Sequence, residues 1–305
     1  MMRALALALA AALAVTVGGA GAQAQAQAGP CPFTPSPDAL TDGAIVTAEP
    51  VDAGSGGACG ITYRSDGLRV RGYVFVPSGT TGALPVLLFA RGGTGDDARI
   101  GRPLLAYLGG LARRGPFVVL ATDYRGTDGG DGRDAYGGAD VNDLLNLIPV
   151  AARIPGADLE RTVLLGFSRG GINTYRAIQD GVPVRAAAVV SGPVDLARSY
   201  EQGGFFLKRA LRGAIGGAPA DMPEEYRKRS ALAWPRDVNV PLLILHGGRD
   251  DRIDGEQIRA FAQALTALGK THELVEFPEG DHMLHNMSVA RDEALLAWFD
   301  RFISR

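Results

Sequence analysis

The feature that most constrains the fold is the segment Gly166-Phe167-Ser168-Arg169-Gly170-Gly171, which has the pattern G-x-S-x-G. The apolar run Thr162–Leu165 comes directly before it, and a helical pattern begins at Gly170. A serine hydroxyl becomes a useful nucleophile when a sharp turn exposes it beside a base, and glycines remove the Cβ atoms that would crowd such a turn. We therefore predict that Ser168 is a nucleophile at a strand–turn–helix junction.

Short apolar runs alternate with helical patterns along most of the chain. The runs are Val86–Ala90, Phe117–Ala121, Val163–Leu165, Ala186–Val190, Leu242–Leu245 and Leu274–Phe277. The helical patterns lie near Arg99–Arg114, Ala139–Arg153, Gly170–Gln179, Gly255–Leu268 and Val289–Phe302. Strands buried on both faces and separated by helices are typical of a parallel sheet. The alternation predicts an α/β fold with a mostly parallel, doubly wound sheet.

Two segments depart from this alternation. Residues 61–64 and 68–76 flank the turn Ser65-Asp66-Gly67, and the second run alternates apolar and polar residues. This pattern predicts an antiparallel N-terminal hairpin. The segment Arg198–Trp234 is long and helical in character. It is either a small helical cap over the site or an ordinary helical connection, and the pattern favours neither.

The N-terminus has the features of a secretory signal. A short basic start precedes an apolar, Ala-rich run and several A-x-A sites. The run is shorter than the roughly 20 residues of a membrane anchor, which is the alternative. We predict a signal peptide at 1–24, an N-terminal extension at 25–60 and one catalytic domain at 61–305. The protein is then exported, periplasmic or secreted, without membrane association after cleavage.

Cys31 and Cys59 are the two cysteines of the 305-residue chain. An even count in an exported protein predicts one disulfide, and two free thiols are the alternative. The spacing is unlike that of a metal site, and we expect neither a metal nor a cofactor. The net charge is −2, without the basic stripe of a nucleic-acid-binding protein. The oligomeric state is not indicated.

Acyl transfer from Ser168 requires a base. Of the four histidines, His282 lies in the loop directly after the last predicted strand, where the chain order Ser–Asp–His places the base. His285 is the reserve candidate, one turn further on. His272 is expected at the surface, and His246 at a strand end in a structural role.

The acid that orients the base should follow the penultimate strand. Asp250 and Asp251 both lie in that loop, and spacing alone does not separate them. The backbone N–H of Arg169 is one expected oxyanion donor. Gly93, in the Gly-rich turn after Val86–Ala90, is the second.

Three arginines lie near these motifs. If Arg91, Arg125 and Arg169 face the site, they favour a substrate that bears a carboxylate. The alternative is that they pair with local carboxylates such as Asp123 or Asp140.

Taken together, the motifs resemble those of the prolyl oligopeptidase family, in particular its exported bacterial members without a propeller domain. The resemblance spans Leu68 to the C-terminus. The matching segments are Arg91-Gly92-Gly93, Asp123-Tyr124-Arg125-Gly126, Gly138–Asp143, Gly166–Gly171, Leu245-His246-Gly247 with Asp250-Asp251-Arg252, and Gly280-Asp281-His282. The resemblance implies an α/β-hydrolase fold and takes Asp250 as the acid. The tyrosine that often supplies the second oxyanion donor in the family is missing here, which favours a backbone donor.

The resemblance further implies a serine hydrolase that cleaves a peptide or ester bond through an acyl-enzyme. The roughly 40 residues before the core are too few for the family's propeller, so we expect a short peptide or small ester as substrate. Phe205 and Phe206 are candidate pocket residues. The alternatives are a carboxylesterase, an acyltransferase that uses the same triad, or a catalytically silent binding protein with this fold.

Overall fold

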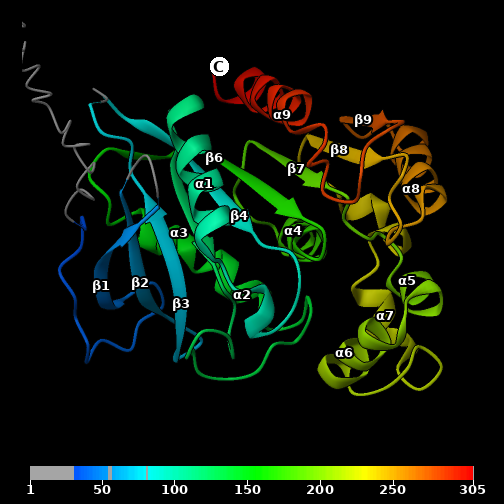
Figure 1. The fold of residues 1–305 in the computed structure, drawn as a ribbon, viewed down its shortest axis with the longest axis horizontal. Coiled ribbons are helices and arrows are strands. Elements are labelled where there is room, and N and C mark those ends of the chain that lie inside the picture. The colour runs from blue at the N-terminus through cyan, green and yellow to red at the C-terminus, as the bar shows by residue number, and fades with distance from the viewer. Residues whose placement is uncertain (1–30, 54–56, 80–81, 305) are drawn as a thin grey trace, which may run out of the picture.

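The computed structural model describes residues 31–53, 57–79 and 82–304. The predicted signal peptide, residues 1–24, lies outside the described residues. The described chain forms a nine-stranded sheet with helices on both of its faces (Figure 1).

The strand order across the sheet is β1-β2-β3-β5-β4-β6-β7-β8-β9. Their bounds are β1 (Ile45–Asp52), β2 (Gly57–Ser65), β3 (Leu68–Phe75), β4 (Leu84–Ala90), β5 (Val118–Thr122), β6 (Ala157–Phe167), β7 (Ala186–Val190), β8 (Leu242–Gly247) and β9 (His272–Phe277). Every pair from β5 to β9 is parallel, whereas β1, β2, β3 and β5 pair antiparallel. This arrangement confirms the mostly parallel sheet with an antiparallel N-terminal hairpin.

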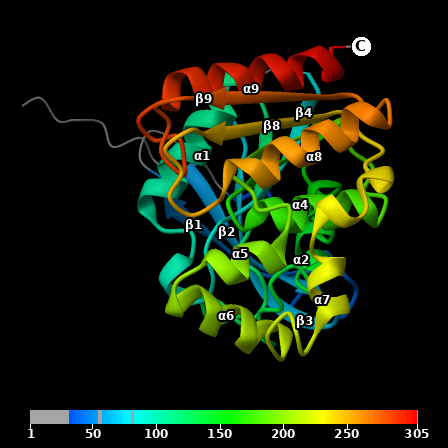
Figure 2. The ribbon, with the colours of Figure 1, turned by 90° about the vertical axis from the view of Figure 1, so that its right-hand side faces the viewer.

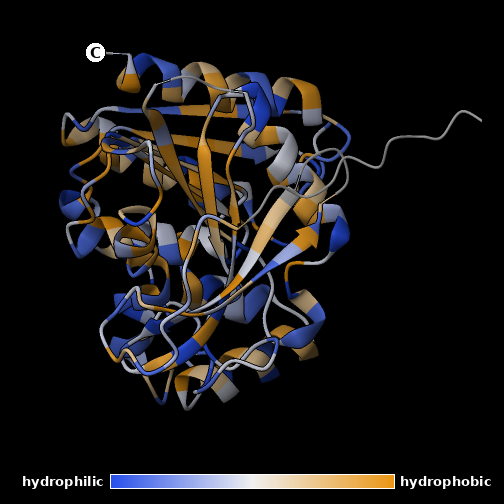
Figure 3. Cartoon of the chain, turned by 90° about the vertical axis from the view of Figure 1, so that its left-hand side faces the viewer, coloured by the Kyte–Doolittle hydropathy of each residue, from blue (hydrophilic) through white to orange (hydrophobic). Residues whose placement is uncertain are grey.

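Apolar side chains leave the central strands on both faces because neighbouring residues of a strand point in opposite directions. Val86 and Leu88 of β4 pack in the core on one face, and Leu87 and Phe89 pack in the core on the other. Figure 3 shows the hydrophobic character of these strands. Each fully buried side chain of this size contributes about 1.5–3 kcal/mol.

The helices are arranged in two layers around the sheet. Their bounds are α1 (Arg102–Arg114), α2 (Val141–Leu145), α3 (Leu147–Ala151), α4 (Gly170–Gln179), α5 (Leu196–Gln202), α6 (Phe205–Ile215), α7 (Pro223–Lys228), α8 (Gly255–Ala267) and α9 (Ser288–Ile303), with 3-10 turns η1 (Asp96–Ala98), η2 (Ala231–Ala233) and η3 (Pro235–Asp237). Helices α1 and α9 cover one face of the sheet, and α2, α3, α4 and α8 cover the other.

The single helix predicted near Ala139–Arg153 is two short helices, α2 and α3. Pro149 lies inside α3 and has no N–H to donate to the carbonyl of Leu145, and its ring crowds that carbonyl. The helix therefore breaks between Leu145, where α2 ends, and Leu147, where α3 begins.

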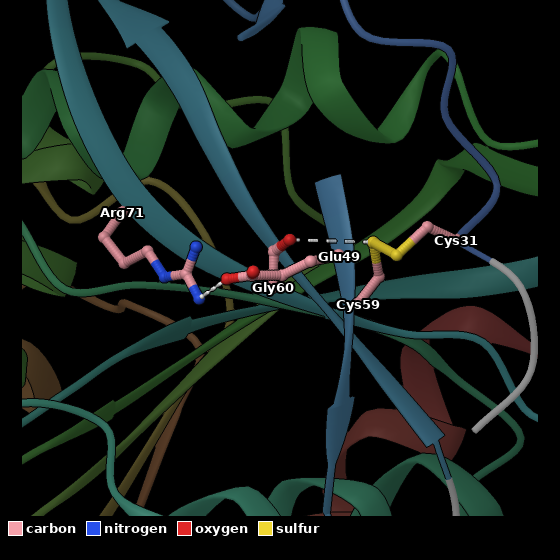
Figure 4. Close-up of a disulfide and its surroundings, with 5 residues drawn as sticks. All are labelled: Cys31, Glu49, Cys59, Gly60 and Arg71. Carbon is pink, nitrogen blue, oxygen red and sulfur yellow. Dashed lines mark hydrogen bonds and ion pairs between the residues drawn. A yellow bond between two sulfur atoms is a disulfide. The ribbon is translucent and has the colours of Figure 1, made fainter. Parts of the chain in front are cut away.

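Strand β1 was not predicted, and its composition explains why. Within β1 only Ile45 is buried, and the apolar residues of the strand do not alternate regularly with polar ones. It is held mainly by backbone pairing with β2 and by two ion pairs, Arg71 of β3 with Glu49 (2.7 Å) and Arg102 of α1 with Asp52 (2.9 Å). The Arg71 side chain crosses β2 at Gly60, where a Cβ atom would lie 2.6 Å from its Nη2 (Figure 4).

The segment Arg198–Trp234 folds into α5, α6 and α7. These helices lie side by side, below β8 and β9 in both ribbon views (Figures 1 and 2). They share a small apolar cluster in which Tyr200 and Tyr226 meet edge to face. Within the described ranges, no helix combines the length and the apolar character needed to cross a bilayer.

Cys31 and Cys59 form a disulfide that ties the start of the described chain to β2 (Figure 4). The two cysteines are 28 positions apart, so the bond closes a long loop of the unfolded chain. Constraining a loop of this length stabilises the folded state by about 3.6 kcal/mol in the chain-entropy model.

Reduction of this disulfide should therefore lower the free energy of unfolding by about 3.6 kcal/mol. Urea unfolding of the oxidised protein, compared with the reduced and alkylated protein, measures the difference. The double variant Cys31→Ser/Cys59→Ser is the control and should match the reduced protein. An unchanged urea midpoint after complete reduction would contradict the expectation.

Candidate active site

Ser168 occupies a sharp turn between β6, which ends at Phe167, and α4, which begins at Gly170. Its φ is +52°, a left-handed conformation that is uncommon for a residue with a side chain. Its N–H donates to the carbonyl of Val190 at the end of β7 (2.8 Å). Backbone strain of this kind is found at functional sites, where the surrounding structure maintains it.

The two glycines of the motif are required by close packing. A Cβ atom at Gly166 would lie 2.3 Å from Thr174 Oγ1, and one at Gly170 would lie 2.0 Å from the carbonyl oxygen of Ala90. A side chain at Gly166 would push α4 away from β6, and one at Gly170 would push the turn away from β4. The G-x-S-x-G pattern therefore follows from the close approach of β6, α4 and β4.

His282 lies in the loop after β9 and reaches the serine. Its Nε2 is 2.8 Å from Ser168 Oγ, and the imidazole is buried. The reserve candidate His285 is exposed, and its Nδ1 lies 3.9 Å from Asp281 Oδ1.

Asp250 holds the other side of the imidazole. Its two carboxylate oxygens each lie 2.9 Å from His282 Nδ1, and Oδ1 also accepts the N–H groups of Arg252 and Ile253 (2.9 Å each). The Asp250 side chain is 0% exposed, whereas that of Asp251 is 86% exposed and lies 4.0 Å from Arg252 Nε. Residue spacing did not decide between Asp250 and Asp251. The fold brings Asp250, and not Asp251, to His282.

Burial by itself raises the pKa of Asp250, but the hydrogen bonds from His282 and from the two backbone N–H groups outweigh it, so the pKa lies below its usual value. Asp250 therefore stays ionised at neutral pH. Behind it, His246 Nδ1 lies 3.7 Å from Asp250 Oδ2. Burial lowers the pKa of His246, which favours its neutral form.

Gly93 and Arg169 both line the same pocket as Ser168. Gly93 has a φ of +69°. Among the hydrogen bonds of the described residues, none is donated by the backbone N–H of either residue. Neither backbone N–H is therefore engaged by another part of the described chain.

The three arginines pair with local carboxylates. Arg91 and Arg169 are fully buried, and Arg125 nearly so. Their partners are Asp123 for Arg91, Asp66 and Asp143 for Arg125, and Asp134 and Asp140 for Arg169. The structure therefore supports pairing of the arginines with local carboxylates, and not their use in binding a substrate carboxylate.

The serine opens into a pocket of about 460 Å³. One wall comes from α5 and α6, which includes Leu196, Leu207 and Phe206, so the segment Arg198–Trp234 contributes directly to the pocket. Phe206 is at the rim, with 84% of its surface exposed. Phe205 meets Phe206 edge to face but is not part of the lining.

Sequence reasoning did not identify several pocket residues. Thr94, Tyr136, Leu196 and Ile253 line the pocket, yet they come from four separate loops and helices. A hydrophobic residue in a helix has the same local pattern whether it faces a core or a pocket, so no sequence signal marked them. Within the part of the chain that the structure describes, no cluster of three or more His, Cys, Asp or Glu side chains is arranged to hold a metal ion.

Residues 108–305 match the model of the prolyl oligopeptidase family, Peptidase_S9. The protein named Uncharacterized peptidase YtmA from Bacillus subtilis (strain 168) is 31% identical over 214 residues, which cover 70% of this chain and 81% of YtmA. Uncharacterized peptidase YuxL from the same organism is 30% identical over 258 residues, which cover 78% of this chain and 38% of YuxL.

Solved structures give the same result. A puromycin-hydrolyzing peptidase from Mycobacterium tuberculosis superimposes with a TM-score of 0.70 and 26% identity over 85% of this chain and 39% of that chain. The acylaminoacyl peptidase of Pyrococcus horikoshii shares the fold, with a TM-score of 0.66 and 23% identity over 84% of this chain and 42% of that chain. This chain thus spans about two fifths of these structures and of YuxL. By the family match, the relatives and the fold, the chain belongs to the prolyl oligopeptidase family of serine hydrolases, with an α/β-hydrolase fold.

Proposed function

We propose that the protein is a serine peptidase that cleaves short peptides through an acyl-enzyme on Ser168, with His282 as general base and Asp250 as the acid that orients it. The observation that carries this proposal is the continuous chain of contacts from Ser168 Oγ to His282 Nε2 (2.8 Å) and from His282 Nδ1 to Asp250 (2.9 Å). The chain begins at a strained turn that opens into a pocket.

The mechanism follows from these distances. Ser168 Oγ attacks the substrate carbonyl as its proton passes to His282 Nε2, and Asp250 stabilises the imidazolium that forms. His282 then gives the proton to the leaving amine, which departs and leaves an ester on Ser168. Water, deprotonated by His282, attacks this ester, and the returning proton restores the Ser168 hydroxyl.

The oxyanion of each tetrahedral intermediate would accept hydrogen bonds from the backbone N–H groups of Arg169 and Gly93. Both residues flank Ser168 in the pocket, and within the described chain neither N–H is otherwise engaged. Donors fixed in this way stabilise charge that develops only in the transition state.

The pocket supports a small substrate. Its volume of about 460 Å³ is within the usual range of small-molecule sites, and α5 and α6 give it an apolar wall. The relatives are named peptidases, and one structural neighbour is a puromycin-hydrolyzing peptidase. We expect small esters to be cleaved as well, since acylation of Ser168 is the same step for both substrate classes.

We also propose that the protein is exported, to the periplasm or the medium. The Cys31–Cys59 disulfide supports this location because such bonds persist in oxidising compartments.

Replacing Ser168 by alanine should lower hydrolysis of aminoacyl p-nitroanilides and p-nitrophenyl acetate by at least about 10³-fold, because the acyl-enzyme can no longer form. A fluorophosphonate probe should label the wild type and not Ser168→Ala. The matched control is Ser199→Ala, a pocket serine whose hydroxyl donates to the Asp195 carbonyl (2.9 Å) and not to His282. Full activity in Ser168→Ala would contradict the proposal, and an unlabelled, inactive wild type would favour a silent binding protein.

Asp250→Asn should lower kcat by about 10⁴-fold, because the amide cannot hold the imidazole in the required tautomer or stabilise its charge. Asp251→Asn is the control at the adjacent position, and its kcat should stay close to the wild-type value since its carboxylate is exposed. The measurement is kcat for p-nitrophenyl acetate. The reverse ranking would transfer the acid role to Asp251.

Phe206→Ala should lower kcat/KM about 10-fold for bulky acyl esters, because a lost apolar contact costs about 1–3 kcal/mol when the substrate reaches it. Acetyl esters should be affected much less. Phe205→Ala removes a neighbouring exposed ring outside the lining and is the matched control. Equal effects of the two variants, or of one variant on both substrates, would place specificity elsewhere in the pocket.

A further inference from the structure

Two buried arginines hold the loop that follows β4. Arg91 Nη1 donates to the carbonyl of Gly92 (3.1 Å) and, at longer range, to that of Gly93 (3.4 Å). Arg169 Nη1 donates to the carbonyl of Gly93 (3.0 Å). Consecutive carbonyls of one loop are thus bound by guanidinium groups from two different elements.

Neither guanidinium group is free to move. Arg91 forms an ion pair with Asp123 (3.1 Å) and also donates to the Asp123 carbonyl (2.6 Å). The two arginines lie over the same ring, that of Tyr124, at 5.1 and 4.6 Å from its centroid. Arg169 is further fixed by two carboxylates, Asp134 and Asp140, at 2.6 Å each.

This arrangement is costly for a purely structural feature. Burial lowers the pKa of Arg91, and the nearby charge of Arg169 lowers it further. Buried ion pairs can often be replaced by apolar side chains with little loss of stability. A role in orienting the loop therefore accounts better for two like charges placed side by side in the core.

Peptide geometry connects the arginines to the reaction. In a trans peptide, the carbonyl of one residue and the N–H of the next point in opposite directions, and no cis bond occurs in the described ranges. Arg91 holds the Gly92 carbonyl toward the interior, so the Gly93 N–H faces the other way. Gly92 itself lies against the turn, since a Cβ atom there would be 3.1 Å from Ser168 Cβ.

We propose that the Arg91 and Arg169 side chains are positioning residues that together set the Gly93 N–H as an oxyanion donor beside Ser168. Arg91 fixes the peptide plane that carries this N–H, and Arg169 fixes the next plane. Arg169 thus supplies one donor from its backbone and positions the other with its side chain. This inference rests on the proposed function of Ser168.

Arg91→Lys and Arg169→Lys test the proposal. Lysine keeps the charge, but its compact ammonium group cannot reproduce the planar fork that bonds a carbonyl and a carboxylate at once. We expect kcat for p-nitrophenyl acetate to fall about 10²-fold in each variant, the usual effect of a displaced oxyanion donor, with KM nearly unchanged. Asp134→Asn, which loosens Arg169 more mildly, should lower kcat by a smaller factor and provides a second variant if either lysine variant is unstable.

Arg125→Lys is the matched control. Arg125 is also a buried, ion-paired arginine, in the same loop as Asp123, but its bonds go to Asp66 and Asp143 and not to the glycines. Its replacement should lower the melting temperature and leave kcat at the wild-type value.

A transition-state analogue separates positioning from general damage. 2,2,2-Trifluoroacetophenone forms a hemiketal oxyanion on the serine, so its Ki should rise in proportion to the loss of kcat/KM across the variants. The acidic limb of the pH profile, which reports the base, should stay in place. Wild-type kcat in folded Arg91→Lys and Arg169→Lys, or a loss of activity without a matching rise in Ki, would overturn the positioning role. Wild-type activity in Ser168→Ala would instead overturn the proposed function.

Discussion

The candidate site depends on how closely the backbone at the end of β6 approaches that of β4. Gly170 meets the Ala90 carbonyl at a distance that admits no side chain, and Gly166 is equally crowded by Thr174 and α4. This contact brings the turn with Ser168 against the loop that contains Gly93. Without this contact, Ser168 and Gly93 would not line one pocket.

The rest of the arrangement is fixed by strand order. Parallel pairing of β8 with β9 brings their carboxyl ends to the same edge, where the Gly248 N–H bonds the Phe277 carbonyl and the Arg249 N–H bonds that of Gly280. Asp250 and His282 project from the two loops joined by these bonds. A pair of residues 32 positions apart is thereby held within hydrogen-bond distance.

A network of buried charge then stiffens the loops around the turn. Burial alone lowers the pKa of Arg169, but Asp134 and Asp140 outweigh it and the pKa is raised, so the guanidinium remains charged in the core. The rings of Tyr124 and Tyr136 lie on the same guanidinium, at 4.6 and 4.8 Å. The long Gly-rich loop that contains Asp134 is thus tied to the nucleophile turn, so its residues can line a pocket with a defined shape.

The sequence by itself determined the parallel sheet, the turn at Ser168 and the approximate positions of base and acid. Apolar runs and glycines reveal strands and turns from neighbouring residues alone, and the order of the motifs along the chain indicates which loops contain the acid and the base. The sequence missed β1, which is held mainly by backbone pairing and two ion pairs rather than by a regular apolar pattern. The resemblance chose Asp250, and only the tertiary structure placed it against His282, because Asp250 and Asp251 are neighbours that differ in burial and not in type. Only the tertiary structure also showed that the three arginines are buried and that α5 and α6 line the pocket. The partners of a charged or apolar side chain are decided by contacts between segments that are distant in the sequence.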